Sequence, residues 1–372
     1  MKKKVVITGL GALTAVGEGS QALWQAALEG RSGISSLASF GLPKISAAVI
    51  RDFSPEKYVT QRKALKVMAR DIQLAVAGAS LAMQDAALNG EFDHERFGVI
   101  VGSGVLNHEL DELACSVQNS LGDDGRLDMA KFGDAGLSAL FPLWLLKYLP
   151  NMSACHISIL FDLQGMNNTL TTGTSAGLQA VGEAFRIIER GGADLMLAGG
   201  AESKVNAVGL SHYRVLGALN EEGFAVGEGA GFLVLEELEH AKKRGARIYA
   251  EIVGFGSSFS GGRKSAMQSA IQEAGLQASD IRYLQAAAIG LKKEDAAENS
   301  GIDEIFNGSR QNLSLHSSKR LIGFTGFSSG ALDLILSTLA LSRKNITYAM
   351  TNASGFNGQA VSLVTKVPGG RK

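Results

Sequence analysis

The chain has little proline, little cysteine and no net charge. Only 5 of its 372 residues are proline and 2 are cysteine, while 36 basic residues balance 36 acidic ones. Two cysteines cannot form a disulfide framework, so we expect a protein of the cytosol, a reducing compartment. A balanced charge provides no field to recruit nucleic acid or an anionic membrane. These absences exclude a disulfide scaffold and argue against nucleic-acid partners.

No apolar run is long enough to span a membrane. The longest weakly polar stretch, Leu74–Met83, is far shorter than the ~20 residues that a spanning helix needs. The lysine-rich start followed by VVITGLGALTAVG superficially resembles a signal peptide, but Gly9, Gly11 and Gly17 interrupt it. We interpret this run as a buried first strand. Neither cysteine and no pair of histidines has metal-ligand spacing, so we expect no metal and no cofactor.

Glycine is abundant, and short β-rich runs alternate with helical patterns. This alternation predicts an α/β protein with buried, largely parallel strands. The expected strands are Val5–Thr8, Gly98–Gly102, Asn168–Thr171, Leu195–Ala198, Gly231–Glu236, Ala250–Phe255 and Ser362–Lys366, and the expected helices include Ser20–Leu28, Leu65–Leu88, Leu178–Arg190, Lys264–Ala274 and Ala331–Leu341.

A weak internal sequence similarity suggests that the chain has two similar halves. VVITGLGAL at 5–13 resembles AEIVGFGSS at 250–258, and each is a strand pattern ending in Gly-x-Gly. We therefore expect halves of residues 1–244 and 245–372. Gly9-Leu10-Gly11 lacks the third glycine and the distant acid of a dinucleotide-binding fingerprint, so we interpret it as a tight turn from strand to helix.

Gly173-Thr174-Ser175-Ala176-Gly177 is a sharper motif. It has the G-x-S-x-G form between a strand pattern and a helix pattern, which is the context of a nucleophile elbow. Ser175 is therefore a candidate nucleophile of an esterase or acyltransferase, and it would need a histidine base oriented by an acid. The candidates for those two roles are His212, His240 and His316, with Asp194, Asp295 and Asp303.

Several segments together resemble the β-ketoacyl-acyl-carrier-protein synthase family of the thiolase fold. They run in order along nearly the whole chain: VVITGLGALTAVG, EGRSGI, FGVIVGSG, GEAFRIIERGGADLMLAGGAE, GFAVGEGAGFLVLEELEHAKKRGARIYAEIVGFGSS and GFNG. The resemblance implies a five-layered α-β-α-β-α fold built from two βαβαβαββ halves.

The resemblance fails at the three positions that carry the family's chemistry. In register with GEAFRIIERGGAD, the catalytic cysteine is replaced by Thr174. The first catalytic histidine corresponds to Ala287 in QAAAIGL, and the second to Phe324 in KRLIGF. The resemblance thus implies that the thiolate and both imidazoles are missing.

The resemblance also implies that part of the supporting scaffold is kept. Asp295 and Glu298 match acidic positions after the first histidine segment, and Lys319 matches the lysine that opens the second. By resemblance, Glu298 and Lys319 form an ion pair. The chain is short for the family, with loops missing after Asn220, after Ser260 and between Ile346 and Met350.

The loss of all three catalytic groups from a scaffold that is otherwise kept resembles what is found in chain-length-factor subunits. Such subunits pair with an active synthase as a heterodimer, contribute a wall of its acyl tunnel and meet acyl carrier protein mainly through that partner. They usually carry glutamine where this chain has Thr174. The resemblance implies a role in polyketide, polyene (including aryl polyene) or fatty-acid-type elongation, and it implies that the strand around Asn168–Thr171 pairs across the dimer.

Large apolar residues stand where family members line or gate the acyl pocket. They could line a tunnel or simply belong to the core. Two alternatives to the subunit role remain: a serine enzyme that uses Ser175, and a homodimeric acyl-binding protein. The candidate tunnel residues are Val105, Leu106, Leu143, Trp144 and Phe356.

Overall fold

A computed structural model describes residues 2–38, 42–88, 92–105, 108–220, 223–259, 262–343, 346–356 and 358–369. Its strands form one sheet whose order is β11-β10-β12-β13-β9-β1-β8-β7-β5-β6. One half of this sheet contains β1 (Val5–Thr14), β5 (Phe97–Gly102), β6 (Asn167–Leu170), β7 (Leu195–Ser203) and β8 (Val226–Glu237). The other contains β9 (Ala250–Ser258), β10 (Tyr283–Gln285), β11 (Ser314–His316), β12 (Tyr348–Ser354) and β13 (Ala360–Lys366).

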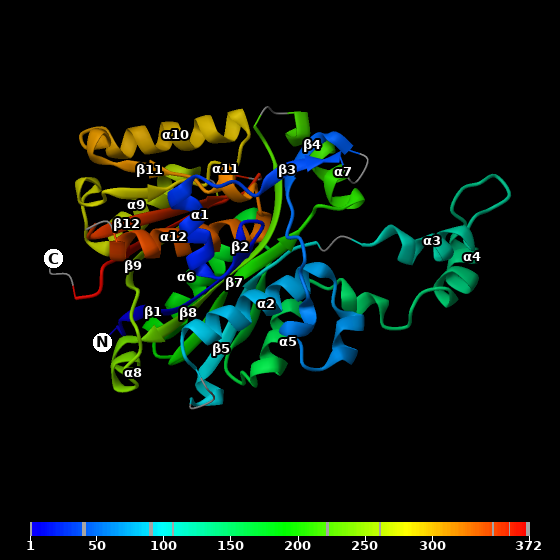
Figure 1. The fold of residues 1–372 in the computed structure, drawn as a ribbon, viewed down its shortest axis with the longest axis horizontal. Coiled ribbons are helices and arrows are strands. Elements are labelled where there is room, and N and C mark those ends of the chain that lie inside the picture. The colour runs from blue at the N-terminus through cyan, green and yellow to red at the C-terminus, as the bar shows by residue number, and fades with distance from the viewer. Residues whose placement is uncertain are drawn as a thin grey trace.

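Helices and half-sheets alternate in layers (Figure 1). Helices α2 (Arg70–Asp85) and α5 (Met152–Phe161) pack on the first half-sheet, and α9 (Gly262–Ala274) packs on the second, with α10 (Lys292–Phe306) on α9. Helices α6 (Ala176–Glu189) and α12 (Ser329–Arg343) pack against each other and contact strands of both halves. The expected thiolase-like α/β fold is therefore confirmed.

The remaining elements connect or flank these layers. The hairpin β1–β2 leads into α1, and β3 pairs with β4, which joins β8. These elements are β2 (Gly17–Glu18), β3 (Ile34–Leu37), β4 (Leu42–Ala48), α1 (Ser20–Glu29), α3 (Leu110–Gln118), α4 (Met129–Lys131), α7 (Ala207–Val215), α8 (Leu238–Lys243) and α11 (Lys319–Ile322).

The strands are less parallel than the alternation predicts. Pairs β5–β6, β5–β7, β10–β11 and β10–β12 are parallel, but β1–β8, β7–β8, β1–β9, β9–β13 and β12–β13 are antiparallel. Strands β1, β7 and β8 are buried along their whole length. Burial on both faces gives continuous apolar runs in either orientation, so the pattern alone did not show the strand direction.

The two matching Gly-x-Gly segments meet at the centre of the sheet. Val5, Val6 and Ile7 of β1 pair with Ile252, Glu251 and Ala250 of β9. The predicted turn at Gly9-Leu10-Gly11 is wrong, because β1 continues through it to Thr14.

These glycines instead allow close helix packing. A Cβ on Gly11 would lie 2.1 Å from the carbonyl oxygen of Gly78 in α2, and a Cβ on Gly256 would lie 2.1 Å from that of Ala266 in α9.

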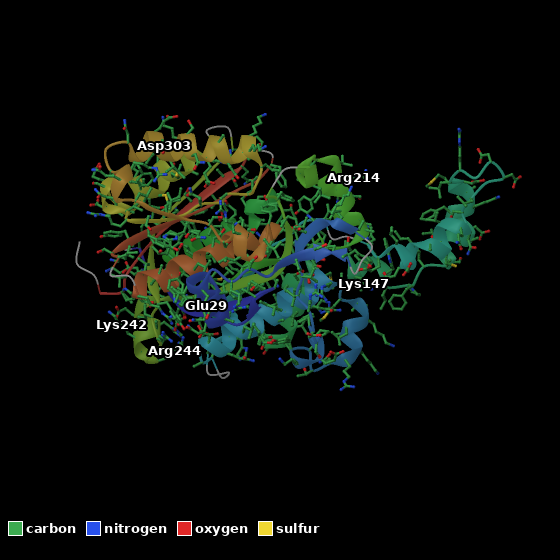
Figure 2. The ribbon with its side chains drawn as sticks, turned by 45° about the horizontal axis from the view of Figure 1, so that its top comes forward. Glu29, Lys147, Arg214, Lys242, Arg244 and Asp303 are labelled. Atoms are coloured by element: carbon green, nitrogen blue, oxygen red, sulfur yellow. The ribbon has the colours of Figure 1, made fainter. Side chains whose placement is uncertain are left out.

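A long excursion between β5 and β6 projects away from the layered body (Figure 1). We call residues 109–149 the arm; it carries α3 and α4. At its base Glu112 pairs with Lys147 and accepts a hydrogen bond of 2.7 Å from the Tyr148 hydroxyl. Lys147 lies where the arm meets the body (Figure 2). Large apolar side chains on the arm are more than a third exposed: Leu110, Val117, Leu121, Leu127, Met129, Leu137, Phe141, Leu143 and Leu145.

The glycine contacts generate a prediction about stability. Gly11→Ala forces a methyl group into the backbone of α2, so the free energy of unfolding should fall by about 1–3 kcal/mol or more. Gly308→Ala is the matched control, because no heavy atom lies within 4 Å of its added Cβ. Urea unfolding followed by circular dichroism measures both. Equal stabilities of the two variants would contradict the packing argument.

Candidate functional site

The three positions implied to have lost the family's chemistry come together in the fold. Thr174 lies in the turn Gly173–Ser175 before α6, Ala287 follows β10, and Phe324 follows α11. All three line one cavity of only about 10 Å³, together with Lys319 and Asp333. None of the residues that line it is a cysteine or a histidine.

Both hydroxyl groups of the GTSAG motif are engaged by backbone carbonyls. The motif has the expected strand–turn–helix context between β6 and α6. Thr174 is buried and its hydroxyl donates a 2.9 Å hydrogen bond to the carbonyl oxygen of Ser354. Ser175 is fully buried and donates to the carbonyl oxygen of Thr172 at 3.0 Å. Neither hydroxyl is therefore placed as an exposed nucleophile.

The residues considered as triad partners of Ser175 lie in separate places. His240 contacts Glu236 at 2.6 Å, and His316 stacks on Tyr283 with ring centroids 4.4 Å apart. His212 lines a larger cavity with Thr174. Of the acids, Asp194 pairs with Arg96, Asp303 pairs with Arg310, and Asp295 accepts from the Gly290 amide. Among the described residues, the structure does not assemble a serine triad around Ser175.

Phe324 fills the site with an aromatic ring. It is almost fully buried, and its ring centroid lies 5.9 Å from that of Phe224, 5.5 Å from that of Phe356 and 6.3 Å from that of Tyr213. Aromatic rings at these separations pack favourably in tilted or edge-on arrangements. The ring thus belongs to an apolar cluster beside Thr174.

Glu298 holds the backbone around Ala287. Its carboxylate accepts hydrogen bonds from the amides of Ala287 at 2.9 Å and Ala288 at 2.8 Å. The side-chain amide of Asn352 donates to the same carboxylate at 3.2 Å. Ala288 has a φ of 37°, a region that a residue with a Cβ rarely adopts. Glu298 therefore acts as an anchor for a strained turn.

The ion pair expected between Glu298 and Lys319 is wrong. Lys319 instead pairs with Asp333 of α12, with Nζ and Oδ2 2.5 Å apart and both side chains buried. Asp333 also accepts hydrogen bonds from the Ser318 hydroxyl and the Gln285 amide. The carboxylate of Glu298 already accepts hydrogen bonds from backbone amides, so Asp333 of α12 pairs with Lys319 instead. Asp333 could have been found from the sequence, since it is the one acid within the apolar helix pattern ALDLILSTLAL.

Asp295 has a local role at the start of α10. Its carboxylate accepts from the Gly290 amide at 3.1 Å, and partial burial raises its pKa. The backbone hydrogen bond opposes that rise. Asp295 thus stabilises the turn after Ala288 and does not line the small cavity.

A larger cavity, which we call the chamber, lies on the other side of Thr174. Its volume is about 800 Å³, within the usual range of small-molecule sites. Of the candidate tunnel residues, Val105 and Phe356 line it, while Leu143 and Trp144 do not. Leu106 lies outside the described residues. The chamber is lined by Gly104, Val105, Pro150, Thr171, Gly173, Thr174, Lys204, His212, Tyr213, Leu216, Phe327 and Phe356.

Leu143 and Trp144 lie at the base of the arm. Leu143 is about half exposed, whereas Trp144 is partly buried. The Trp144 ring lies 4.9 Å from that of His108 and 5.2 Å from that of Tyr148. Trp144 therefore packs within the base of the arm, whereas Leu143 is exposed there.

Charged side chains lie against one wall of the chamber, and no sequence pattern pointed to them. Lys204 Nζ lies 3.3 Å from Oε1 of the fully buried Glu202. Glu202 also accepts hydrogen bonds from the Tyr213 hydroxyl and the Phe327 amide, each at 3.0 Å. Burial raises the pKa of Asp71 to about 7, and the charge of Glu202 adds to the rise. The Ser203 amide donates to Asp71 and opposes that rise.

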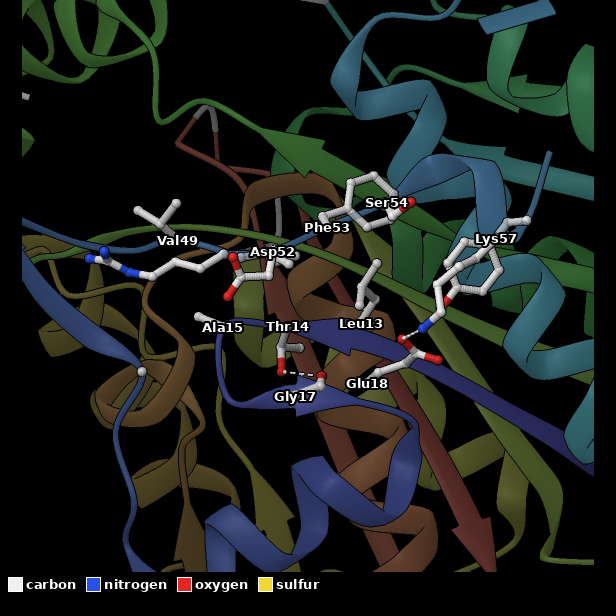
Figure 3. Close-up of a pocket in the computed structure, with 14 residues that line it drawn as sticks. Leu13, Thr14, Ala15, Gly17, Glu18, Val49, Asp52, Phe53, Ser54 and Lys57 are labelled. Carbon is white, nitrogen blue, oxygen red and sulfur yellow. Dashed lines mark hydrogen bonds and ion pairs between the residues drawn. The ribbon is translucent and has the colours of Figure 1, made fainter. Parts of the chain in front are cut away.

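A separate pocket of about 230 Å³ lies between the β1–β2 turn and the loop 49–58 (Figure 3). Across it Glu18 and Lys57 point toward one another and form an ion pair of 3.1 Å. None of the predicted site residues lines this pocket. Within the described ranges, no three His, Cys, Asp or Glu side chains are grouped to hold a metal ion.

Two family models match most of the chain. The β-ketoacyl synthase N-terminal domain matches residues 2–241, and the C-terminal domain matches residues 249–351. No helix in the described part of the chain has the length and apolar character needed to cross a membrane.

Similar proteins agree with these matches. The 3-oxoacyl-[acyl-carrier-protein] synthase 2 of Vibrio cholerae is 32% identical over 426 positions, covering 98% of this chain and 99% of that protein. The protein of the same name from Staphylococcus aureus is 30% identical over 421 positions, with 98% of each covered. These alignments are longer than the 372-residue chain, so the relatives have residues without a counterpart here. The structure described as the ishigamide ketosynthase/chain length factor superposes with a TM-score of 0.85 at 25% identity, covering 99% of this chain and 100% of that one.

The burial of Asp71 predicts a pH dependence of stability. Its raised pKa in the folded state favours the protonated form, so its contribution to stability is lost as the pH rises from about 4 to about 7. Asp71→Asn keeps an acceptor for the Ser203 amide but cannot ionise. Relative to the wild type, this variant should gain about 3 kcal/mol of unfolding free energy between pH 4.5 and 7.5, at 1.36 kcal/mol per pKa unit. Urea unfolding at both pH values measures the difference, and a difference that does not change with pH would overturn the assignment.

Proposed function

The chain belongs to the β-ketoacyl synthase family, and from this premise we propose that it is a non-catalytic subunit of the chain-length-factor type. In this role it pairs with an active β-ketoacyl-acyl-carrier-protein synthase and shapes the acyl tunnel of that partner. The superposition on a ketosynthase/chain length factor structure supports this role. The elongation would be of the polyketide, polyene or fatty-acid type.

The observation that carries the proposal is the chemistry of the small cavity. Thr174, Ala287 and Phe324 line it, and no thiol or imidazole is among its lining groups. Condensation by a synthase needs a thiolate to hold the acyl chain and donors to stabilise developing negative charge. A threonine hydroxyl bound to a carbonyl, a methyl group and a phenyl ring supply neither. The Lys319–Asp333 pair and the Glu298 anchor persist around this centre, which fits a subunit kept for its shape.

The free edge of the sheet supports assembly with a second subunit. Strand β6 ends the sheet, and its only partner among the described strands is β5. The carbonyls of Met166 and Leu170 accept hydrogen bonds from Val99 of β5 and from Ser103 directly after it, so by alternation the backbone of Thr169 faces outward. In the isolated chain the Thr169 N–H donates to the Asn168 side-chain oxygen at 2.8 Å, a local bond that a partner strand would replace. An unpaired strand edge is a template for pairing with another chain. We infer that β6 pairs with the equivalent strand of the synthase.

The arm supplies apolar surface for the same partner. It leaves the body between β5 and β6, the two strands at this end of the sheet (Figure 1). Exposed apolar side chains in such number are typical of a surface that another protein covers. Leu143, about half exposed at the arm base, is our candidate for the wall of the partner's tunnel. Val105 and Phe356 lie in the chamber of this chain instead.

The catalytic claim has a direct test. When the isolated chain is incubated with acyl thioesters, its intact mass should not change, because the hydroxyls of Thr174 and Ser175 donate to backbone carbonyls and not to a base. An active synthase treated in the same way is the positive control. A stoichiometric acyl adduct on Thr174 or Ser175 would contradict the proposal. An adduct that disappears in Ser175→Ala would favour the alternative of a serine esterase or acyltransferase.

The assembly claim is tested at Thr169. Thr169→Pro removes the outward N–H, which in the isolated chain donates to Asn168 Oδ1, and it leaves the hydrogen bonds to the carbonyls of Met166 and Leu170 intact. Affinity for the synthase should therefore fall at least about tenfold. Thr169→Val keeps the N–H and is the matched control. Sedimentation of mixtures with the synthase measures affinity, and circular dichroism checks folding. If both variants form the heterodimer equally well, edge pairing is excluded; a stable homodimer that ignores the synthase would favour the acyl-binding alternative.

A further inference from the structure

The pocket between the β1–β2 turn and the loop 49–58, which we call the turn pocket, is separate from the small cavity and from the chamber. It shares no lining residue with either of them. Its volume of about 230 Å³ is below the usual range of drug-sized sites, so a ligand that fits it is small. Two acidic side chains, Glu18 and Asp52, and two basic ones, Arg51 and Lys57, are among its lining residues. The turn pocket therefore offers partners to both a cation and an anion.

Asp52 supplies a carboxylate without a protein partner. The residue is exposed, and no hydrogen bond or ion pair joins its carboxylate to another residue in the described ranges. Figure 3 shows this carboxylate directed toward the β1–β2 turn, on the opposite side of the turn pocket from the Glu18–Lys57 pair. Its negative charge is therefore available to an ammonium group in the pocket.

Lys57 can change its partner without leaving a carboxylate unpaired. It pairs with Glu18 at 3.1 Å, and both side chains are exposed, so the pair contributes little to stability. The buried Tyr58 hydroxyl has no hydrogen-bond partner in the described part of the chain. Burial raises the pKa of Tyr58, and the nearby Glu18 carboxylate adds to the rise, so this phenol stays protonated and remains a donor. When Lys57 turns to an anion in the pocket, the Tyr58 hydroxyl can donate to Glu18 in its place.

We propose that the turn pocket binds a small zwitterion with one ammonium and one carboxylate group, the class of free amino acids. The ammonium group pairs with Asp52, and the carboxylate pairs with Lys57. A zwitterion fits because the charged side chains of the pocket balance, and because hydrogen bonds between charged groups are stronger than those between neutral ones. The methylene groups of the ligand cover apolar lining side chains such as Leu13 and Val49. This inference goes beyond the proposed function and needs neither a partner subunit nor an acyl group.

Saturation-transfer-difference NMR on the full chain measures the binding of glycine, β-alanine, γ-aminobutyrate and 6-aminohexanoate. These probes differ only in the number of methylene groups between their two charged groups, so they report the spacing that the pocket accepts. At least one of them should bind saturably with a Kd of about 1 mM or below. The amine and the carboxylic acid with the chain length of the tightest probe should each bind at least about tenfold more weakly, because each lacks one charge-assisted contact.

Two matched pairs of variants locate the site. Asp52→Asn removes the charge but keeps a residue that tolerates the left-handed backbone at this position, where φ is 55°. Asp162→Asn is its control, since Asp162 is also exposed, has a φ of 52° and does not line the turn pocket. Lys57→Met keeps the aliphatic stem without the charge, and Lys63→Met does the same at an exposed lysine outside the pocket. The Asp52 and Lys57 variants should each weaken binding of the zwitterion at least about fivefold, and the two controls should not.

Three results would overturn the proposal. They are the absence of saturable binding for all four zwitterions, equal binding of the zwitterion and of the amine or acid that lacks one charge, and equal affinities of the pocket variants and their controls. The subunit role is measured separately, by sedimentation with the synthase. A chain that forms the heterodimer but binds no zwitterion refutes this inference alone, and a chain that binds the zwitterion but no synthase refutes only the subunit role.

Discussion

Close contact between helix and strand backbones, permitted by paired glycines, determines how each half of this protein is built. Gly9 and Gly11 let α2 lie directly on β1, and Gly254 and Gly256 let α9 lie directly on β9. The two strands pair with each other where the halves meet, so both outer layers are fixed relative to one junction. Helices α6 and α12 fill the space between the half-sheets and bring the turn at Thr174 close to Asp333 and Phe324. The site is thus a consequence of this central packing.

Polar and charged side chains surround the small cavity, while no cysteine or histidine is among the residues that line it. Lys319 and Asp333 form a buried ion pair, and breaking such a pair by removing one partner typically costs about 3–5 kcal/mol. Glu298 holds the strained turn at Ala288. These interactions preserve the shape of a synthase around positions that provide no thiolate and no imidazole. A protein of this construction contributes surface and cavity, which is why the proposed role is that of a partner subunit.

Much of the fold could be predicted from the sequence because buried strands and helices leave strong periodic patterns. The seven expected strands and five expected helices overlap observed elements, although α2 begins at Arg70, five residues after its predicted start. The turn predicted at Gly9-Leu10-Gly11 is wrong because glycine permits close packing as well as tight turns, and the sequence alone does not distinguish the two. The Lys319–Asp333 pair and the wall of Lys204 and Glu202 depend on contacts between distant segments, which no local pattern encodes. The apolar character of the run ALFPLWLLKYL was visible in the sequence, but its position on an exposed arm was not.

The central claim is that this chain acts through a partner, and one measurement tests it most directly. The chain is co-expressed with an active synthase and its acyl carrier protein, the complex is weighed by native mass spectrometry, and the length of the acyl product is determined. The account predicts a 1:1 heterodimer whose products lengthen when Leu143, an exposed residue of this chain, is changed to alanine. Products of unchanged length from an intact heterodimer, or a synthase that works identically without this chain, would contradict it.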